Sequence, residues 1–351
     1  MSDLGLGIIG SGFMGLTYAE VLTRHIKGAR LVAVAGGKRA EQLAGEYQVP
    51  AESNIEKLLA RPDLQGVVLA TPDNLHCEQV IAAAEAGKHV LVEKPMAPTV
   101  AECDRMIAAC THAGVNLAVV QTERYRKLTL RAKELVDDGA IGPIWMMRTI
   151  SAFPRSLTDE ILSTRDWMND PKSGGLFMGI AAHNTDFLRW ISGRNAVRVY
   201  AQVATFSDLK APAQSVMAQI EFEGGVMGHM WISSEFPAPS LPSSEVRFQI
   251  IGSKGILDFE NFEFLDLGKS GQWERVYVPE KFDYLKEPKS AIRLVPHIGV
   301  IQEFVDSVNE RRPPRVGGAE GRAAVELCEA CLISARLREP VDLPLSGEVT
   351  A

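Results

Sequence analysis

The first third of the chain alternates between short apolar runs and segments in which apolar residues recur with helical spacing. The runs Ala29–Ala35 and His89–Val92 are rich in Val and Leu, as strands buried on both faces are. Helical spacing follows such runs, for example over Val100–Ala113. Strands that alternate with helices in this way build a parallel sheet with right-handed crossovers. The pattern therefore predicts a doubly wound α/β domain over residues 1–122.

The pattern changes after residue 122, where most apolar runs succeed one another through short polar turns. These runs lie at 144–150, 197–206, 216–222, 226–233, 246–251 and 256–259. Strands joined by short turns pair antiparallel, so residues 123–351 are expected to form an α+β domain with a large, mostly antiparallel open sheet. Helical spacing at 174–190, 298–310 and 319–338 predicts three further helices, the last two able to pack back on the first domain.

A glycine motif begins directly after the first apolar run. Gly10, Gly12 and Gly15 are spaced G-x-G-x-x-G between a predicted strand and a predicted helix. The first glycine permits the tight turn, the second leaves the backbone open to a pyrophosphate, and the third lets the helix pack closely on the strand. Phe13 and Met14, at the start of a helix whose positive dipole end faces the phosphates, are expected beside the cofactor. This stretch predicts a Rossmann dinucleotide-binding domain.

The tip of the second predicted strand carries Gly36, Gly37, Lys38 and Arg39 and no acidic residue. In a dinucleotide-binding domain a carboxylate at this place binds the ribose 2′-hydroxyl of NAD, whereas a cation accommodates the 2′-phosphate of NADP. The glycines and the two cations therefore favour NADP over NAD. Solvated residues in the first turn of the next helix are an equally ordinary explanation of Lys38 and Arg39, so NAD stays an alternative.

Polar residues also follow three further strands of the predicted parallel sheet. Ligands bind at the carboxyl ends of the strands in such sheets. The expected cofactor contacts there are Thr71, Pro72, Asn74, His76, Glu93, Lys94 and Gln121. Lys94 is also a candidate for proton transfer or for orienting a substrate hydroxyl, because a partly desolvated amine beside a cationic nicotinamide gives up its proton more readily. On composition alone, Glu93 and Lys94 are equally typical of a surface ion pair.

Four motifs together resemble the glucose-fructose oxidoreductase and inositol 2-dehydrogenase family (Gfo/Idh/MocA) over essentially the whole chain. They are the glycine motif, T-P-D-N-L-H at 71–76, E-K-P at 93–95 and the stretch from Gly174 to Asp186. The resemblance implies a Rossmann domain, a C-terminal domain with a large open sheet, and NAD(P)-dependent oxidation or reduction of sugars and polyols. It also implies a homo-oligomer, a dimer or a tetramer, assembled through that sheet, on which Met227, Met230 and Ile232 are expected to be exposed.

By the same resemblance, Lys94 matches the active-site lysine of the family and His183 the active-site histidine. The family commonly has an aspartate four residues before this histidine, where this chain has Gly179. Three explanations stay open: another group replaces the carboxylate, the substrate occupies the vacated space, or the dehydrogenase activity is modified or lost. Asp186, one turn beyond His183, is a poor replacement, since it is better placed to orient the histidine or to serve local packing.

Trp167 is a candidate for stacking on a sugar face, because an indole offers a flat apolar surface. A partly buried structural tryptophan is the alternative. Arg124 and Tyr125 follow the sixth predicted strand, and they either contact the substrate or tie the two domains together. With Lys94, Gly179 and His183, these residues complete the expected substrate site.

The expected activity is transfer of a hydride between nicotinamide and a hydroxyl-bearing carbon of a sugar, sugar derivative or cyclic polyol. Lys94 and His183 are expected to hold and shuttle the hydroxyl proton. A second hypothesis is elimination or glycoside cleavage through transient oxidation with bound NAD, without net redox change. A third is a non-catalytic nucleotide-binding regulator.

Composition narrows the remaining classes of partner. The net charge of −7 and the scattered Lys and Arg residues give no basic surface for a nucleic acid. No apolar run approaches the roughly 20 residues of a membrane-spanning helix, and no charged-then-apolar leader precedes the first strand, so we expect a cytoplasmic protein. The five cysteines are an odd number, and Cys328 and Cys331 have no second Cys or His pair nearby, so neither disulfides nor a metal site is expected.

Overall fold

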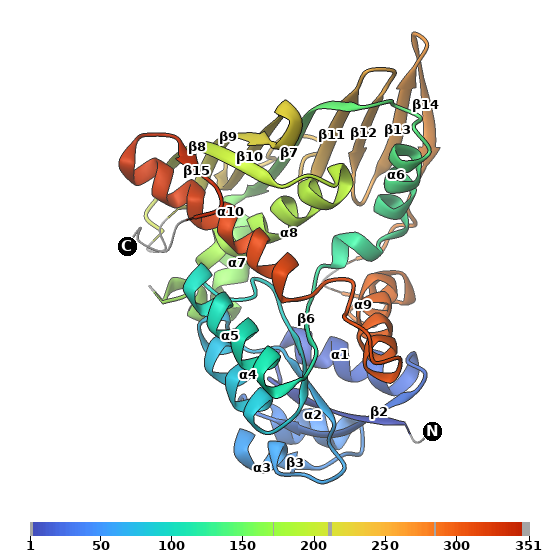
Figure 1. Cartoon of the computed structure of the whole chain (residues 1–351), viewed down its shortest axis with the longest axis vertical. Coiled ribbons are helices and arrows are strands. Elements are labelled where there is room, and N and C mark those ends of the chain that lie inside the picture. The colour runs from blue at the N-terminus through green and yellow to red at the C-terminus, as the bar shows by residue number, and fades with distance from the viewer. Residues whose placement is uncertain (1–2, 171, 210–212, 284–285, 346–351) are drawn as a thin grey trace. The chain divides into compact units, whose positions relative to one another are not determined.

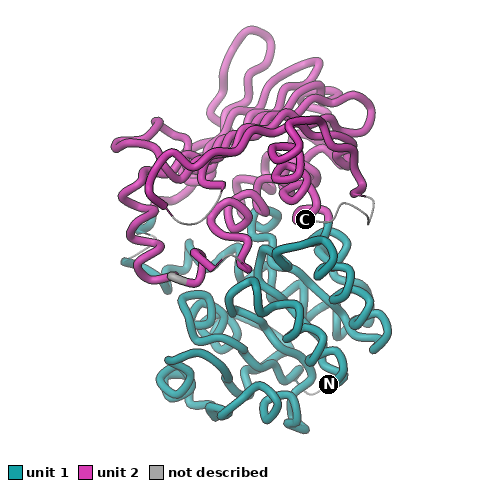
Figure 2. The backbone as a smooth tube through the Cα atoms, turned by 90° about the vertical axis from the view of Figure 1, so that its left-hand side faces the viewer, with its two compact units in different colours: residues 1–125, 282–322 teal, residues 126–281, 323–351 magenta. Residues whose placement is uncertain are grey.

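The computed structural model describes residues 3–170, 172–209, 213–283 and 286–345. The chain divides into two compact units (Figure 1 and Figure 2). The first comprises the described residues within 1–125 and 282–322, and the second those within 126–281 and 323–351. Residues 282–322, with the helix predicted at 298–310, thus belong to the same unit as the start of the chain, in keeping with the expectation that the C-terminal helices can pack on the first domain.

The first unit contains a six-stranded parallel sheet in the order β3-β2-β1-β4-β5-β6. Its strands are Leu4–Ile9 (β1), Ala29–Ala35 (β2), Ala51–Glu52 (β3), Gly66–Leu69 (β4), His89–Val92 (β5) and Leu117–Val119 (β6). Its helices are Phe13–Arg24 (α1), Ala40–Glu46 (α2), Ile55–Leu59 (α3), His76–Glu85 (α4), Val100–Ala113 (α5) and Ala291–Asn309 (α9). The strand order reverses between β1 and β4, as in the doubly wound fold that the alternating pattern predicts.

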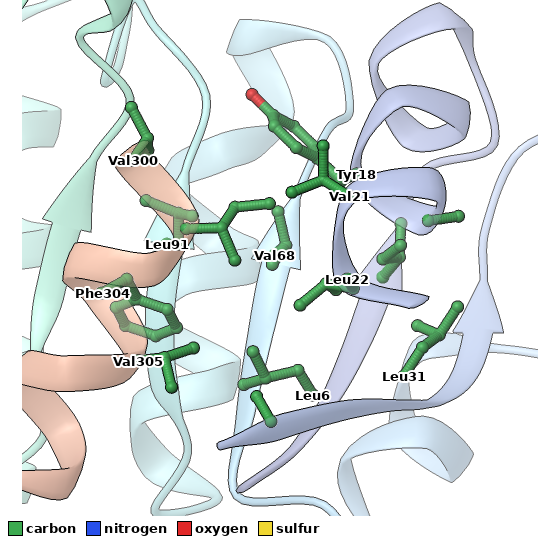
Figure 3. Packing of buried hydrophobic residues seen from close by; sticks show 14 of the residues in the cluster. Leu6, Tyr18, Val21, Leu22, Leu31, Val68, Leu91, Val300, Phe304 and Val305 are labelled. Carbon is green, nitrogen blue, oxygen red and sulfur yellow. The ribbon is translucent and has the colours of Figure 1, made fainter. Parts of the chain in front are cut away.

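Helices α1 and α9 share the core of this unit although they lie at opposite ends of the chain (Figure 3). Figure 3 shows Tyr18, Val21 and Leu22 of α1 and Val300, Phe304 and Val305 of α9 together with Leu6, Val68 and Leu91 of the strands. Helix α9 starts at Ala291 rather than at residue 298 and contains Pro296. A proline removes one helical hydrogen bond. Buried side chains on both sides of Pro296, Leu294 and Val300 among them, offset that loss through burial.

The second unit contains a nine-stranded sheet in the order β14-β13-β12-β11-β7-β10-β9-β8-β15. Its strands are Ile144–Pro154 (β7), Ala196–Ala204 (β8), Ser215–Phe222 (β9), Val226–Phe236 (β10), Arg247–Gly252 (β11), Ile256–Glu260 (β12), Phe264–Lys269 (β13), Gln272–Tyr277 (β14) and Val341–Asp342 (β15). Its helices are Lys127–Asp137 (α6), Arg155–Thr164 (α7), Gly175–Ser192 (α8) and the part of Gly318–Leu337 (α10) beyond residue 322. The pairs are antiparallel except for β7 and β10, which confirms a mostly antiparallel sheet.

Helices α7 and α8 contact β10 on one face of this sheet, and side chains alternate between that face and the open one. Met227 is 59% exposed on the open face. The expectation that Met230 and Ile232 are exposed as well is wrong, because both occupy the opposite parity of β10 and are buried at 0% and 1% exposure.

Glu260, at the end of β12, is a buried carboxyl with 2% exposure. Its two oxygens accept hydrogen bonds from the N–H groups of Val246, at 3.1 Å, and Phe262, at 2.8 Å. Burial raises the pKa of Glu260 to about 7, and the two N–H donors oppose that rise. The carboxyl therefore takes up a proton near neutral pH in the folded chain.

This raised pKa predicts a pH-dependent step in stability. Because the folded pKa lies above the ordinary value of 4.5, the contribution of Glu260 is complete below about pH 4.5 and is lost as the pH rises through 7. The loss is at most about 3.5 kcal/mol, at roughly 1.4 kcal/mol per pKa unit. Glu260→Gln is expected to remove this step from urea unfolding curves between pH 5 and pH 8.5.

All five tryptophans lie in the second unit, so their fluorescence reports its unfolding. Glu274→Gln, which changes an exposed carboxylate on β14, is the matched control and should leave the pH profile as it is in the unmodified protein. An equal step in Glu260→Gln and the unmodified protein would contradict the assignment.

Candidate active site

The three glycines of the turn between β1 and α1 have different surroundings. Gly10 has a φ of +110°, and a Cβ there would lie 2.5 Å from the carbonyl oxygen of Ala70. A Cβ at Gly15 would lie 2.1 Å from the carbonyl oxygen of Gly10. A Cβ at Gly12 would meet nothing within 4 Å. Gly10 and Gly15 therefore serve the fold, whereas Gly12 leaves open space.

The start of α1 suits an anion. Gly12 is the N-cap residue, no side chain caps the helix, and the first turn, which begins with Phe13 and Met14, has no acidic residue. The backbone N–H groups and positive dipole end of such a turn favour a phosphate, and the open space at Gly12 lets one approach closely. These features fit the pyrophosphate of a dinucleotide.

The tip of β2 is held by the hydroxyl of Ser11, a residue outside the predicted cofactor contacts. Ser11 Oγ accepts a hydrogen bond from the N–H of Arg39 at 3.1 Å. Gly36 and Gly37 have φ values of +75° and +82°, and a Cβ at Gly37 would lie 2.4 Å from Ser11 Oγ. This close approach disfavours an acidic side chain at position 37.

Lys38 and Arg39 both have exposed side chains at this tip. Neither forms an ion pair with another of the residues that the structure describes. Lys38 and Arg39 therefore place two positive charges without an ion-pair partner among the described residues at the strand tip, where a dinucleotide-binding domain binds the adenosine ribose.

His76 links two of the loops at the carboxyl ends of the strands. Its ring is 1% exposed, with Nε2 lying 3.0 Å from the carbonyl oxygen of Thr71 and Nδ1 3.1 Å from that of Pro95. Thr71 in turn donates its hydroxyl to Gln79 at 2.6 Å. The imidazole therefore braces the 71–76 loop against the turn that follows Lys94. The remaining expected contacts of the first of these loops, Pro72 and Asn74, lie between β4 and α4.

Glu93 is 7% exposed and is therefore no member of a surface ion pair. Tyr18 of α1 donates its hydroxyl to one oxygen of the Glu93 carboxylate, and the N–H of Lys94 donates to the other at 2.9 Å. The backbone of Lys94 is thus held by a buried carboxylate that α1 itself anchors. Gln121, 1% exposed, follows the neighbouring strand β6.

Arg293 of α9 is a buried cation beside the glycine turn, with 2% exposure. Its guanidinium lies 4.5 Å from the centre of the Phe13 ring and donates to Thr17 Oγ1 at 2.9 Å. Tyr125 packs against the same helix, since a Cβ at Gly299 would lie 2.7 Å from its ring. The neighbouring Arg124 is partly buried. Helix α9 thus supports the start of α1, which no local pattern in the sequence indicated.

In the second unit, α8 is fixed by the residues that follow His183. Asn184 donates to Thr149 Oγ1 at 2.5 Å and to Ser151 Oγ at 3.1 Å, both on β7. Thr185 donates to the carbonyl oxygen of Ala324 on α10 at 3.1 Å. His183 is partly exposed, whereas residues 181–182 and 184–188 are buried. The backbone that carries the His183 imidazole is therefore held in place by buried, hydrogen-bonded neighbours.

Gly179, His183 and Asp186 occupy successive turns of α8. Asp186 is 1% exposed, in keeping with a role in local packing. Trp167 lies in a short 3₁₀ segment, Asp166–Asn169, and is partly buried. It packs against the cluster of Leu162, Met168 and Leu176.

The expected cofactor residues therefore gather at the carboxyl edge of the parallel sheet in the first unit, while Trp167, Gly179 and His183 belong to the second. Among the described residues, no three His, Cys, Asp or Glu side chains are grouped so as to hold a metal ion. In the same part of the chain, no helix is long and apolar enough to cross a membrane. The five cysteines are all buried thiols.

Comparison with known proteins matches both units to one family. Residues 4–121 match the model of an oxidoreductase family with an NAD-binding Rossmann fold, and residues 129–258 match the GFO/IDH/MocA C-terminal domain.

Among individual proteins, the chain is 26% identical to myo-inositol 2-dehydrogenase of Thermotoga maritima, over 96% of this chain and 98% of that one. It is 30% identical to 2,7-anhydro-N-acetylneuraminate hydratase of Mediterraneibacter gnavus, over 55% of this chain and 50% of that one. Levoglucosan dehydrogenase, solved in complex with NADH and L-sorbose, has the same fold, with a TM-score of 0.83 at 24% identity over 99% of this chain and all of that one.

Two glycine variants separate the structural from the binding role of the turn. Gly15→Ala is expected to lower the free energy of unfolding by about 1–3 kcal/mol, because its Cβ collides with backbone. Gly12→Ala is expected to change that free energy by less than about 0.5 kcal/mol while raising the dissociation constant for the dinucleotide about 10-fold or more. Urea unfolding and isothermal titration calorimetry measure the two effects. A Gly12→Ala protein that binds as tightly as the unmodified one would contradict this division of roles.

Proposed function

Because this chain belongs to the Gfo/Idh/MocA family, we propose that it transfers a hydride between a nicotinamide dinucleotide and a hydroxyl-bearing carbon of a sugar, sugar derivative or cyclic polyol. The observation that carries the proposal is the uncapped start of α1 over the open space at Gly12, with Lys94 held nearby in the same unit by Glu93 and Tyr18. When bound, the dinucleotide supplies the hydride acceptor or donor.

The residues of the first unit would hold the dinucleotide in an order that follows the strands. The turn from Gly10 to Gly15 would hold the pyrophosphate, and the tip from Gly36 to Arg39 the adenosine ribose. The loops at 71–76 and 93–94, with Gln121, would line the nicotinamide half. His76 would act by fixing two of these loops, since its ring nitrogens face backbone carbonyl oxygens.

Lys94 and His183 would handle the proton of the reacting hydroxyl. An imidazole near neutral pH suits general acid–base work, and an ammonium group orients a hydroxyl oxygen. Trp167, Arg124 and Tyr125 would contact the rest of the sugar. The firm packing of Asn184 and Thr185 supports this role for His183, because an acid–base group must be held in place.

We propose NADP as the preferred dinucleotide. Support comes from Lys38 and Arg39, which have no ion-pair partner among the described residues, and from the close approach of Gly37 to Ser11, which disfavours a carboxylate there. At the same tip, the backbone N–H of Arg39 donates to Ser11 Oγ, so it is not directed at a ribose hydroxyl.

We further propose a homo-oligomer that packs through the open face of the nine-stranded sheet. Met227, Met217 and Met146 are 59%, 47% and 40% exposed there and lie on neighbouring strands. An exposed apolar surface of this kind is typical of an interface between subunits. Sedimentation velocity that finds only a monomer at micromolar concentration would contradict this proposal.

A second candidate is a reaction without net redox change, in which transient oxidation drives elimination or hydration. Gly179, in place of a carboxylate, and the similarity to a hydratase over half of the chain favour it as the alternative. Substrate consumed over many turnovers with no change in nicotinamide absorbance at about 340 nm would establish it in place of net oxidation.

Replacing the two proposed proton-handling residues tests the main proposal. Lys94→Ala and His183→Ala are each expected to lower kcat/KM about 100-fold or more, since general acid–base groups contribute about 10²–10⁴-fold. His183→Ala should leave the dissociation constant for the dinucleotide within about threefold, because His183 lies outside the unit that would bind it. Lys57→Ala and His112→Ala, which change exposed side chains, are the matched controls. A Lys94→Ala enzyme within about threefold of the unmodified one would refute the assignment.

Arg39→Ala tests the choice of dinucleotide. The variant is expected to lower kcat/KM with NADP about 10-fold or more and to leave kcat/KM with NAD within about threefold, because a charge-assisted contact to the 2′-phosphate is lost. Steady-state kinetics with both dinucleotides measure the split, again with Lys57→Ala as control. A large preference of the unmodified enzyme for NAD would overturn the proposal.

A further inference from the structure

The first turn of α1, which the proposed dinucleotide site uses, has no side-chain cap among the described residues. Its N-cap residue is Gly12, and Gly10 lies just before it. Helix ends fray, and glycine gives the backbone at such an end additional freedom. The N–H groups that would bind a pyrophosphate therefore depend on a restraint from outside the turn for a fixed direction.

Thr17 connects this turn to such a restraint. It lies one turn further along α1 and is 2% exposed. Its hydroxyl donates to the carbonyl oxygen of Phe13 at 3.0 Å. A threonine hydroxyl that donates once can still accept, and Arg293 of α9 donates to the same oxygen at 2.9 Å. The Thr17 hydroxyl therefore joins the guanidinium of Arg293 to the backbone of Phe13, the first residue of the helix.

Arg293 also contacts the side chain of Phe13 directly. Its guanidinium lies 4.5 Å from the centre of the Phe13 ring, and it donates to the carbonyl oxygen of Pro288 at 2.5 Å. A planar guanidinium can stack on a ring and donate hydrogen bonds at the same time. Arg293 thus holds Phe13 twice, once through the ring and once through the carbonyl group that Thr17 binds.

Packing of α9 on α1 does not by itself explain an arginine at this place. The other buried side chains that α9 adds to the shared core are apolar, Leu294 and Phe304 among them. Burying a charged group, as at the 2% exposed Arg293, costs more free energy than burying an apolar side chain of similar size. A hold on the first helical residue accounts for the choice of residue, because only a donor can bind the Thr17 oxygen.

We propose that Arg293, acting through Thr17 and Phe13, is a positioning residue that sets how tightly the dinucleotide binds. This rests on the proposed function and assigns part of the affinity of its dinucleotide site. Because the first turn is already held, binding does not have to order it, and that cost is removed from the affinity. The effect is common to every ligand with a pyrophosphate at the start of α1.

Variants of Arg293 and Thr17 test this role by binding, without any turnover. Arg293→Met keeps the length and apolar packing of the side chain but removes its donors. Thr17→Val replaces the hydroxyl by a methyl group, and Thr17→Ser restores the hydroxyl. Val305→Ala is the matched control, because Val305 lies in the same core and on the same helix as Arg293, but next to Gly28, beyond the other end of α1. Isothermal titration calorimetry gives the dissociation constants of NADP, NAD and ADP-ribose, which share the pyrophosphate.

Arg293→Met is expected to raise the dissociation constants of all three ligands about 10-fold or more, and Thr17→Val about fivefold, because the first turn must then be ordered on binding. A chain with both changes should bind no more than about twofold more weakly than Arg293→Met, since the two side chains form one link. Thr17→Ser and Val305→Ala should stay within about twofold of the unmodified chain, although Val305→Ala lowers its melting temperature.

An Arg293→Met protein that binds the three ligands within about threefold of the unmodified chain would overturn the inference. Effects of Arg293→Met and Thr17→Val that multiply, or an equal loss of affinity in Val305→Ala, would overturn it as well. So would a loss confined to NADP, which would place the effect at the 2′-phosphate. If thermal unfolding shows that Arg293→Met does not fold, Thr17→Val and Thr17→Ser decide, and equal dissociation constants in those two overturn the inference.

The same measurements separate this inference from the proposed reaction. Dinucleotides that bind with the expected ratios but exchange no hydride with any sugar or polyol would contradict the proposed function and leave the role of Arg293 standing. An unmodified chain that binds none of the three ligands would overturn both.

Discussion

The close approach of two backbone segments at the start of α1 is the constraint on which the first unit depends. The carbonyl oxygen of Gly10 lies only 2.1 Å from the position that a Cβ of residue 15 would take. This contact seats α1 directly against the end of β1, so Tyr18 reaches the Glu93 carboxylate and Phe13 reaches Arg293. The contact between Gly15 and the Gly10 carbonyl thus fixes the start of α1, and through Tyr18 and Phe13 this helix contacts the turn that carries Lys94 and the helix α9.

Elements whose signal is local could be predicted from the sequence, and elements whose signal is not local could not. The buried strands β2 and β5 and the helix α5 appear at their predicted bounds, because apolar runs and helical spacing identify them by themselves. Strands β13 and β14 were missed, since their polar side chains, such as Asp266 and Arg275, satisfy one another across the ladder. The early start of α9 was missed because Pro296 is normally a helix breaker, and distant packing overrides it here.

The candidate site divides in the same way. The glycine motif, the 71–76 loop and Glu93–Lys94 are short motifs, so the sequence predicted them as a group, and in the structure they lie at one sheet edge. Ser11, Tyr18 and Arg293 were missed, because each matters through a partner distant in the chain, in one case 276 positions away.

The discontinuity of the first unit has a consequence for how the chain folds during synthesis. When residues 1–125 have left the ribosome, the six strands are all present, but α9, which contributes Val300, Phe304 and Val305 among others to the shared core, is not. At about 5–20 residues per second, the roughly 200 residues up to position 322 take about 10–40 s to follow. For that interval the apolar side chains of α1 that share a core with α9 in the finished unit have no cover from that helix.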